Sequence, residues 1–147
     1  MALQNERRGE HLMRVLVLAV NDAYFAVPMA TVHQVLRHPV VTRVPLSPPG
    51  LLGVVNVRGE IVPLLDTGVM TATGALSDPP FAVLVNGEKD VVALAAEELP
   101  TAADFEEPVG AGTKPGELGV FSYGGRLVVL VDIEELVKNR LDLKRAS

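Results

Sequence analysis

Asp66 is the residue with the strongest catalytic potential, because it stands in the run Leu64-Leu65-Asp66-Thr67-Gly68. Two such aspartates, one from each of two chains, can share a proton and activate a water molecule, which is the chemistry of a dimeric aspartic protease. A structural role competes with this one, since an aspartate that follows an apolar strand can cap the next helix. No later apolar-apolar-Gly segment is present to brace a protease loop. The sequence therefore favours the capping role and keeps the protease as an alternative.

The three histidines, His11, His33 and His38, do not form a recognisable ligand set. His33 and His38 are five residues apart and have no carboxylate near them in the sequence, so we expect surface or half-buried side chains and no metal site. The absence of cysteine excludes disulfides and Cys-based metal sites. The glycines within 110–119 lack the Lys-Ser/Thr ending of a phosphate-binding loop. We expect no cofactor and no enzymatic activity.

The amino-acid composition argues against some kinds of binding partner. The 147 residues carry a formal net charge of −5 and are 48% hydrophobic, and no cluster of lysines and arginines forms a basic patch. Nucleic acid and anionic membrane surfaces are therefore unfavourable partners. No apolar run approaches the roughly 20 residues of a transmembrane helix, and the run over 15–20 is too short for a signal peptide. We expect a folded cytoplasmic protein that does not insert into a membrane.

Arg58 differs from these candidates because an arginine at this position suits the binding of a partner rather than catalysis. It stands with Gly59 between two apolar runs, 54–57 and 61–65, a pattern that predicts a β-hairpin with a tight turn at Arg58-Gly59. Such a turn favours Gly, Asn or Asp, so the turn itself does not require an arginine. One interpretation is a solvated arginine at a loop tip. The other is a guanidinium held on a rigid hairpin for the carboxylates or carbonyl groups of a partner.

The same hairpin pattern returns later in the chain without insertion or deletion. Segment 53–66 matches segment 119–132 at a constant offset, which pairs Gly53 with Gly119, Gly59 with Gly125, and Asp66 with Asp132. We interpret this as an internal repeat, in which each half contains two strand pairs and a short helix. The place of Arg58 is taken by Gly124 in the second copy. Only the first hairpin therefore presents a cation at its turn.

The remaining elements follow from periodicity. The run over 15–20 predicts a buried strand paired with 24–27. Met29, Val32 and Leu36 recur at helical spacing after Pro28, which predicts a short helix over 29–37. Asp132 and Glu135 have the spacing of a helix capping box and predict a C-terminal helix. We also expect a strand over 40–46, a helical turn at 51–52, a hairpin over 81–94, a short helix over 95–99 and a loop over 100–116.

The run Asn56-Val57-Arg58-Gly59-Glu60-Ile61-Val62-Pro63-Leu64-Leu65-Asp66, preceded by 48–54, resembles the central signature of the CheW-like adaptor domain of bacterial chemotaxis. The resemblance extends over nearly the whole chain. It implies an all-β fold with short helices, built from two five-stranded SH3-like β-barrels that an internal repeat relates, with a C-terminal helix. It also implies three parts: a tail over 1–13, a CheW-like domain of two interleaved barrels over 14–139, and a tail over 140–147.

The resemblance implies that the protein functions by binding. CheW-like proteins connect the cytoplasmic tips of chemoreceptors to the regulatory domain of the histidine kinase CheA, within receptor arrays at the inner face of the membrane. Carried over by position, the resemblance places partner contacts at Arg58, with Asn56 and Gly59 shaping its hairpin. It places further contacts at Val32 and Gln34 of the expected first helix.

Three positions depart from the pattern of that family. Gln34 stands where glutamate is frequent, Thr67 where leucine is usual, and Glu97 where aspartate is common. These departures bear on the choice of partner more than on the fold. They leave open an adaptor of a pilus or other non-flagellar chemosensory pathway.

Overall fold

The computed structural model describes residues 12–138 and consists mainly of β-strands. Its strands are β1 (Met13–Val20), β2 (Ala23–Pro28), β3 (Val32–Arg37), β4 (Val41–Thr42), β5 (Leu51–Val57), β6 (Glu60–Leu65), β7 (Phe81–Asn86), β8 (Val91–Ala96), β9 (Thr101–Phe105), β10 (Glu117–Tyr123) and β11 (Arg126–Val131). The helical elements are short: a 3-10 turn η1 (Met29–Thr31), an α-helix α2 (Thr67–Met70), and helical backbone over 133–138.

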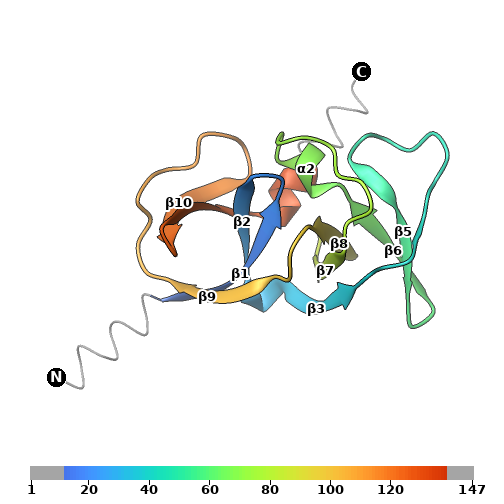
Figure 1. Cartoon of the computed structure of the whole chain (residues 1–147), viewed down its shortest axis with the longest axis horizontal. Helices are drawn as coiled ribbons and strands as arrows, with labels where there is room; N and C mark the ends of the chain where they lie inside the picture. Colours follow the sequence, from blue (N-terminus) through green and yellow to red (C-terminus); the bar gives the residue numbers. More distant parts are fainter. Residues whose placement is uncertain (1–11, 139–147) are drawn as a thin grey trace.

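The strands form two sheets that lie side by side (Figure 1). One, the β1 sheet, has five strands in the order β10-β11-β2-β1-β9, and the other, the β7 sheet, has six in the order β3-β7-β8-β6-β5-β4. The sixth strand, β4, contains only two residues. The architecture confirms the predicted pair of small β-barrels related by an internal repeat.

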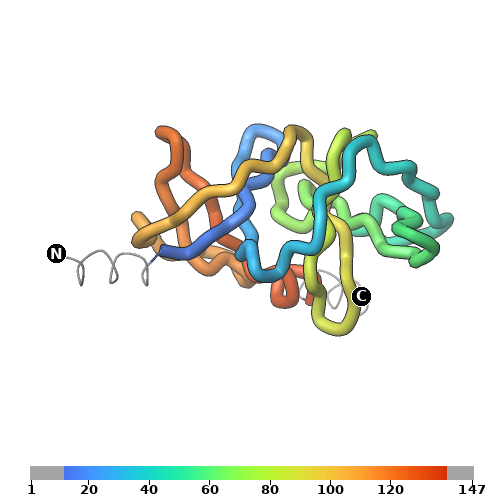
Figure 2. Tube along the Cα trace, turned by 90° about the horizontal axis from the view of Figure 1, so that it is seen from below, coloured from blue at the N-terminus to red at the C-terminus, as the bar shows by residue number. Residues whose placement is uncertain are grey.

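The two halves of the chain exchange hairpins. The β1–β2 hairpin comes from the first half, yet β2 pairs in parallel with β11 of the second half. The β7–β8 hairpin comes from the second half, and β8 pairs in parallel with β6 of the first half. Each sheet therefore needs strands from both halves, as the crossing paths of the trace in Figure 2 show.

The repeat is visible in the hydrogen bonds as well as in the sequence. The N–H of Asp66 donates to the carbonyl of Gly50 at 2.9 Å, and the N–H of Asp132 donates to that of Gly116 at 2.8 Å. In both hairpins a register shift directly precedes the matched glycine, Gly53 in β5 and Gly119 in β10. The two copies thus share a backbone hydrogen bond and a register shift, in addition to the matching glycines in their sequences.

Strand β1 joins the hydrophobic cores of the two sheets. Leu16, Leu18 and Val20 belong to the larger core, which includes most of the β7 sheet. Val15 and Val17 belong to the smaller core within the β1 sheet. A strand with both faces buried appears in the sequence as a continuous apolar run, and the buried strand predicted over 15–20 is confirmed.

The helix predicted over 29–37 is wrong. Only Met29–Thr31 turns, as a single 3-10 turn in which the Thr31 hydroxyl donates to the Pro28 carbonyl at 2.7 Å. Val32–Arg37 is strand β3, paired antiparallel with β7. Apolar residues three and four apart are compatible with one face of a helix, but a short run does not distinguish the two periods, and β-branched valines favour a strand.

Four other predicted segments also need correction. The helix expected over 95–99 is the end of β8 followed by bends, and the loop expected over 100–116 contains strand β9. The expected helical turn at 51–52 is the start of β5. The strand expected over 40–46 is reduced to β4. Strand β9 forms because it pairs with β1, which is far away in sequence, and local propensity does not reveal such a partner. The end of β8 and the start of β5 are extended because each pairs within its own hairpin.

The two predicted tails fall largely outside the described residues. Met13, counted in the N-terminal tail, opens β1, and the C-terminal tail over 140–147 lies wholly beyond residue 138. Between residues 12 and 138, no helix has the length and apolar character needed to cross a membrane.

Candidate partner-binding site

The β5–β6 turn holds Arg58 in a backbone conformation that glycine normally takes. Arg58 has φ +53° and Gly59 has φ +88°, the pair of positive values that defines the tight hairpin turn matched to strand twist. The corresponding residues of the β10–β11 turn, Gly124 and Gly125, have φ +60° and +76°. The predicted turn at Arg58-Gly59 is confirmed, and one non-glycine residue occupies its left-handed first position.

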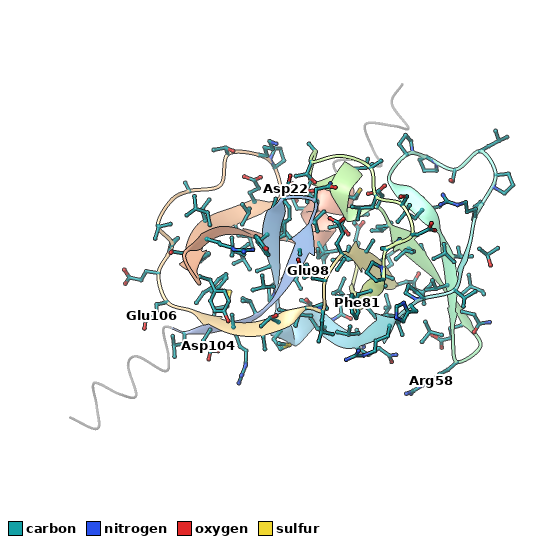
Figure 3. The ribbon with its side chains drawn as sticks, in the orientation of Figure 1. Asp22, Arg58, Phe81, Glu98, Asp104 and Glu106 are labelled. Atoms are coloured by element: carbon teal, nitrogen blue, oxygen red, sulfur yellow. The ribbon has the colours of Figure 1, made fainter. Side chains whose placement is uncertain are left out.

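Asn56 braces this turn from the strand. Its side-chain Oδ1 accepts a hydrogen bond from the N–H of Gly59 at 2.9 Å. Arg58 is exposed, and its side chain extends from the hairpin tip away from the body of the protein (Figure 3). The hydrogen bond from Gly59 to Asn56 therefore stabilises a tight turn with positive φ values, and this turn carries the exposed guanidinium of Arg58.

The guanidinium of Arg58 makes no ion pair within residues 12–138. The ion pair present in that range joins Arg14 Nε to Asp104 Oδ1 at 3.7 Å, in the β1 sheet. Unlike a half-buried arginine, Arg58 therefore has its planar donors directed to solvent, where a carboxylate or carbonyl group can receive them.

Val32 and Gln34 lie at a different place from the Arg58 hairpin. Both are half-buried on β3, at one edge of the β7 sheet, and a register shift separates them. Strands β7, β8 and β6 stand between β3 and β5 in the order of that sheet. The structure therefore brings Asn56, Arg58 and Gly59 together and leaves Val32 and Gln34 as a separate, strand-borne pair.

Asp66 is engaged as a structural carboxylate. Only 2% of it is exposed, and it is the N-cap of α2, accepting from the N–H of Val69 at 3.1 Å. The same carboxylate accepts from the N–H of Leu76 at 3.0 Å, which fastens the following loop. Its twin Asp132 accepts from the N–H of Glu135 at 3.4 Å. These bonds argue against the protease alternative, because the carboxylate is committed to the backbone.

The described histidines have ordinary surroundings. His33 Nε2 lies 2.5 Å from the side-chain oxygen of Asn86, and the ring of His38 stacks on Phe81 with 6.4 Å between centroids. Across residues 12–138, no three His, Asp or Glu side chains gather as metal ligands would. His11 lies outside the described residues.

Sequence reasoning missed one charged surface. Glu60, Glu88, Asp90 and Glu134 line a single groove, together with Lys89. They come from β6, from the β7–β8 turn and from the helical backbone over 133–138. These three segments are far apart along the chain, so no sequence motif predicts the groove. The parallel pairing of β6 with β8 brings its walls together.

Fold and site together define a class: a β-barrel protein that displays an arginine on a tight hairpin turn and uses Asp66, the buried aspartate of residues 12–138, as a helix cap. The sequence matches the CheW-like domain family over residues 14–141. It is 28% identical over 137 residues to Chemotaxis protein CheW of Klebsiella aerogenes, covering 84% of this chain and 81% of that protein. The chain therefore belongs to the CheW-like domain family.

A solved structure agrees with the sequence match. The scaffolding protein TtCheW from Thermoanaerobacter tengcongensis superposes with a TM-score of 0.74 at 17% identity, covering 86% of this chain and 92% of that one. Its likeness supports the fold of two sheets and short helices. The family is one of non-catalytic adaptors and scaffolds in chemotaxis.

Proposed function

We propose that this protein is an adaptor that couples chemoreceptor cytoplasmic tips to the regulatory domain of the histidine kinase CheA. Its place of action would be the cytoplasm, at receptor arrays on the inner face of the membrane. Membership in the CheW-like family supports the adaptor role, and the scaffolding protein TtCheW has the same fold. The net charge of −5 does not favour nucleic acid as an alternative partner.

The conformation of Arg58 is the observation that carries this proposal. A left-handed backbone costs a residue with a Cβ on the order of 1 kcal/mol relative to glycine. The matched turn uses Gly124 at nearly the same φ, so the fold has no need of a side chain there. The cost is offset by no hydrogen bond or ion pair of Arg58 within residues 12–138. Binding of a partner's carboxylate or carbonyl groups accounts for the arginine.

Val32 and Gln34 supply the second proposed contact. They lie on β3, whose other edge is unpaired in the described sheet order, and both side chains are half-buried. A strand edge of this kind offers backbone groups as well as side chains to a partner. Two separate contact regions on one small protein suit an adaptor, because each region can engage a different partner.

The test is a binding measurement with the kinase regulatory domain and a receptor tip from the same genome. Arg58→Gly removes the cation and gives the first turn the composition of the second. We expect it to weaken binding of at least one partner by tenfold or more, about 1.4 kcal/mol, as for an interface hot spot. The thermal midpoint should not fall. Wild-type affinity for both partners in Arg58→Gly would contradict the proposal.

A matched control uses the repeat. Gly124→Arg in the Arg58→Gly background returns an arginine to a tight turn, but on the wrong barrel. It should not restore binding if the position of the cation matters. Repeating the measurement with kinase and receptor domains of a pilus or other non-flagellar pathway decides between the two kinds of circuit, since a partner set that binds identifies its own pathway.

A further inference from the structure

A pocket of about 310 Å³ lies near the end of the β5–β6 hairpin that is opposite the Arg58 turn. One wall belongs to the segment 38–43, which connects β3 to β4 and continues beyond it, and the other wall is the segment 78–80, which leads into β7. Small-molecule sites in proteins begin at about this volume. The pocket can therefore hold a compound of few atoms.

The floor of the pocket is apolar and comes from Val41 of β4, Leu52 of β5 and Leu64 of β6. Val41 pairs with Val55, and Leu64 pairs with Gly53. Val55 and Gly53 are two residues apart on β5, so their partners face the same side of the sheet. All three floor residues pack in the larger hydrophobic core. Since Leu64 is fully buried, Val41 and Leu52 supply the apolar surface that a ligand can reach.

The two walls are built in the same way. Each contains a residue with left-handed backbone directly before a proline: His38 before Pro39, and Asp78 before Pro79, both with φ +47°. A proline fixes its own φ and restricts the residue that precedes it. The N–H of His38 donates to the carbonyl of Pro80 at 2.7 Å, which joins one wall to the other. The walls are therefore held in place without a ligand.

The pocket is lined by one positive and one negative side chain that do not pair with each other. Arg43 and Asp78 both line it, and both are exposed. Within residues 12–138, neither of them forms an ion pair. His38, the other titratable residue of the lining, stacks on Phe81, the first residue of β7, with 6.4 Å between ring centroids (Figure 3). A ligand that carries both a carboxylate and an ammonium group is complementary to this pair of charges.

We propose that the pocket binds a free α-amino acid with an apolar side chain of about the size of leucine. Its carboxylate pairs with Arg43, its ammonium group pairs with Asp78, and its side chain rests on Val41 and Leu52. An α-amino acid carries both charges beside one apolar branch, which is the combination that the lining offers. Exposed ion pairs contribute little, so the affinity should be in the millimolar range. The site is separate from the Arg58 turn and does not depend on the proposed adaptor function.

The experiment is a titration of the full chain with L-leucine, followed in the amide NMR spectrum. The signals of Val41, Leu52 and Asp78 should shift and reach saturation. Two analogues remove one charge each: L-leucinamide lacks the carboxylate, and 4-methylpentanoate lacks the ammonium group. Each analogue should bind about two- to fivefold more weakly than leucine, which is the range that an exposed ion pair supplies.

Two variants assign the charges to their partners. Arg43→Gln should weaken the binding of leucine but not that of leucinamide. Asp78→Asn should weaken the binding of leucine but not that of 4-methylpentanoate, and asparagine tolerates the left-handed backbone of this wall. The control Arg58→Gly should leave the affinity for leucine unchanged.

Two results would overturn the proposal. One is the lack of any saturable shift with leucine. The other is an equal affinity for leucine and both analogues, because the charged pair would then play no part in binding. In that case the pocket would suit an apolar side chain of a protein partner.

Discussion

The β5–β6 and β10–β11 hairpins share one backbone and differ in where they carry positive charge. In the second hairpin the cation is on the strand, where Arg126 lies 4.6 Å from the ring centroid of Tyr24, and the turn is Gly124-Gly125. In the first hairpin the matching strand position is Glu60, and the cation, Arg58, has moved into the turn. Arg126 thus rests on an aromatic ring of the protein itself, whereas Arg58 projects into solvent (Figure 3).

This difference distinguishes positions that both hairpins need for their backbone structure from positions whose side chains can vary on the surface. The glycine after the register shift, the second turn glycine and the capping aspartate recur in both copies. Positions 56, 58 and 60 differ between the copies. In the first copy, Asn56 accepts a hydrogen bond from the turn and Arg58 places a positive charge at its tip. The comparison predicts which substitutions affect stability and which affect binding.

The largest expected effect comes from the capping aspartates. Asp66→Ala should lower the free energy of unfolding by about 3 kcal/mol, since it removes a helix cap and leaves the buried N–H of Leu76 without its acceptor. Asp132→Ala, at the half-buried twin, should cost only about 1 kcal/mol. Urea unfolding of both variants measures the two values.

Asp66→Asn is the control for this pair, because an amide oxygen keeps one acceptor for the backbone donors while removing the charge. It should cost less than Asp66→Ala. Equal losses for Asp66→Ala and Asp132→Ala would mean that the loop contact to Leu76 adds nothing, and that the two caps are equivalent.

The hairpins were predictable from sequence because their structure is local. Turn glycines, an apolar run on either side and an aspartate after the second strand specify each unit without reference to the rest of the chain. The repeat followed from the same residues, and the cap at Asp66 was recognised through its twin at Asp132. These signals also carried the family resemblance.

Strand β3 and the acidic groove were not predictable in this way. Val32 and Gln34 were expected on a helix because the spacing of Met29, Val32 and Leu36 suits one, and only pairing with β7 decides otherwise. The groove depends on the exchange of hairpins, which places β6 beside β8. Such long-range pairing leaves no mark in a short window of sequence.

Exchanging the first turn residues is the second test of the comparison. Arg58→Gly should raise the free energy of unfolding and Gly124→Arg should lower it, each by about 0.5–1 kcal/mol. The backbone is left-handed at both sites, and the greater freedom of an unfolded glycine offsets part of the strain. A Cβ at Gly124 meets no atom within 4 Å, so collision does not contribute. A stabilising Gly124→Arg would refute the strain argument.

The brace under the first turn gives a smaller effect. Asn56→Ala removes the hydrogen bond to the Gly59 N–H and should cost about 0.5–1 kcal/mol, since the bond is exposed to water. Partner binding should weaken too, because the turn then positions Arg58 less rigidly. The matched variant Ser122→Ala in the second hairpin should change neither quantity. A drop in stability without any loss of binding would show that the brace serves the fold alone.

The smallest expected effect concerns the two arginines themselves. Arg126→Ala removes a cation–π contact at a solvent-exposed site and should lower the free energy of unfolding by about 0.5 kcal/mol. The ring protons of Tyr24 should shift at the same time, because the guanidinium no longer lies over the ring. Arg58→Ala should leave Tyr24 unchanged and stability nearly so, yet weaken the partner. If Arg126→Ala weakened the partner as much as Arg58→Ala does, both hairpin tips would belong to the binding surface, and the repeat would supply two cations rather than one.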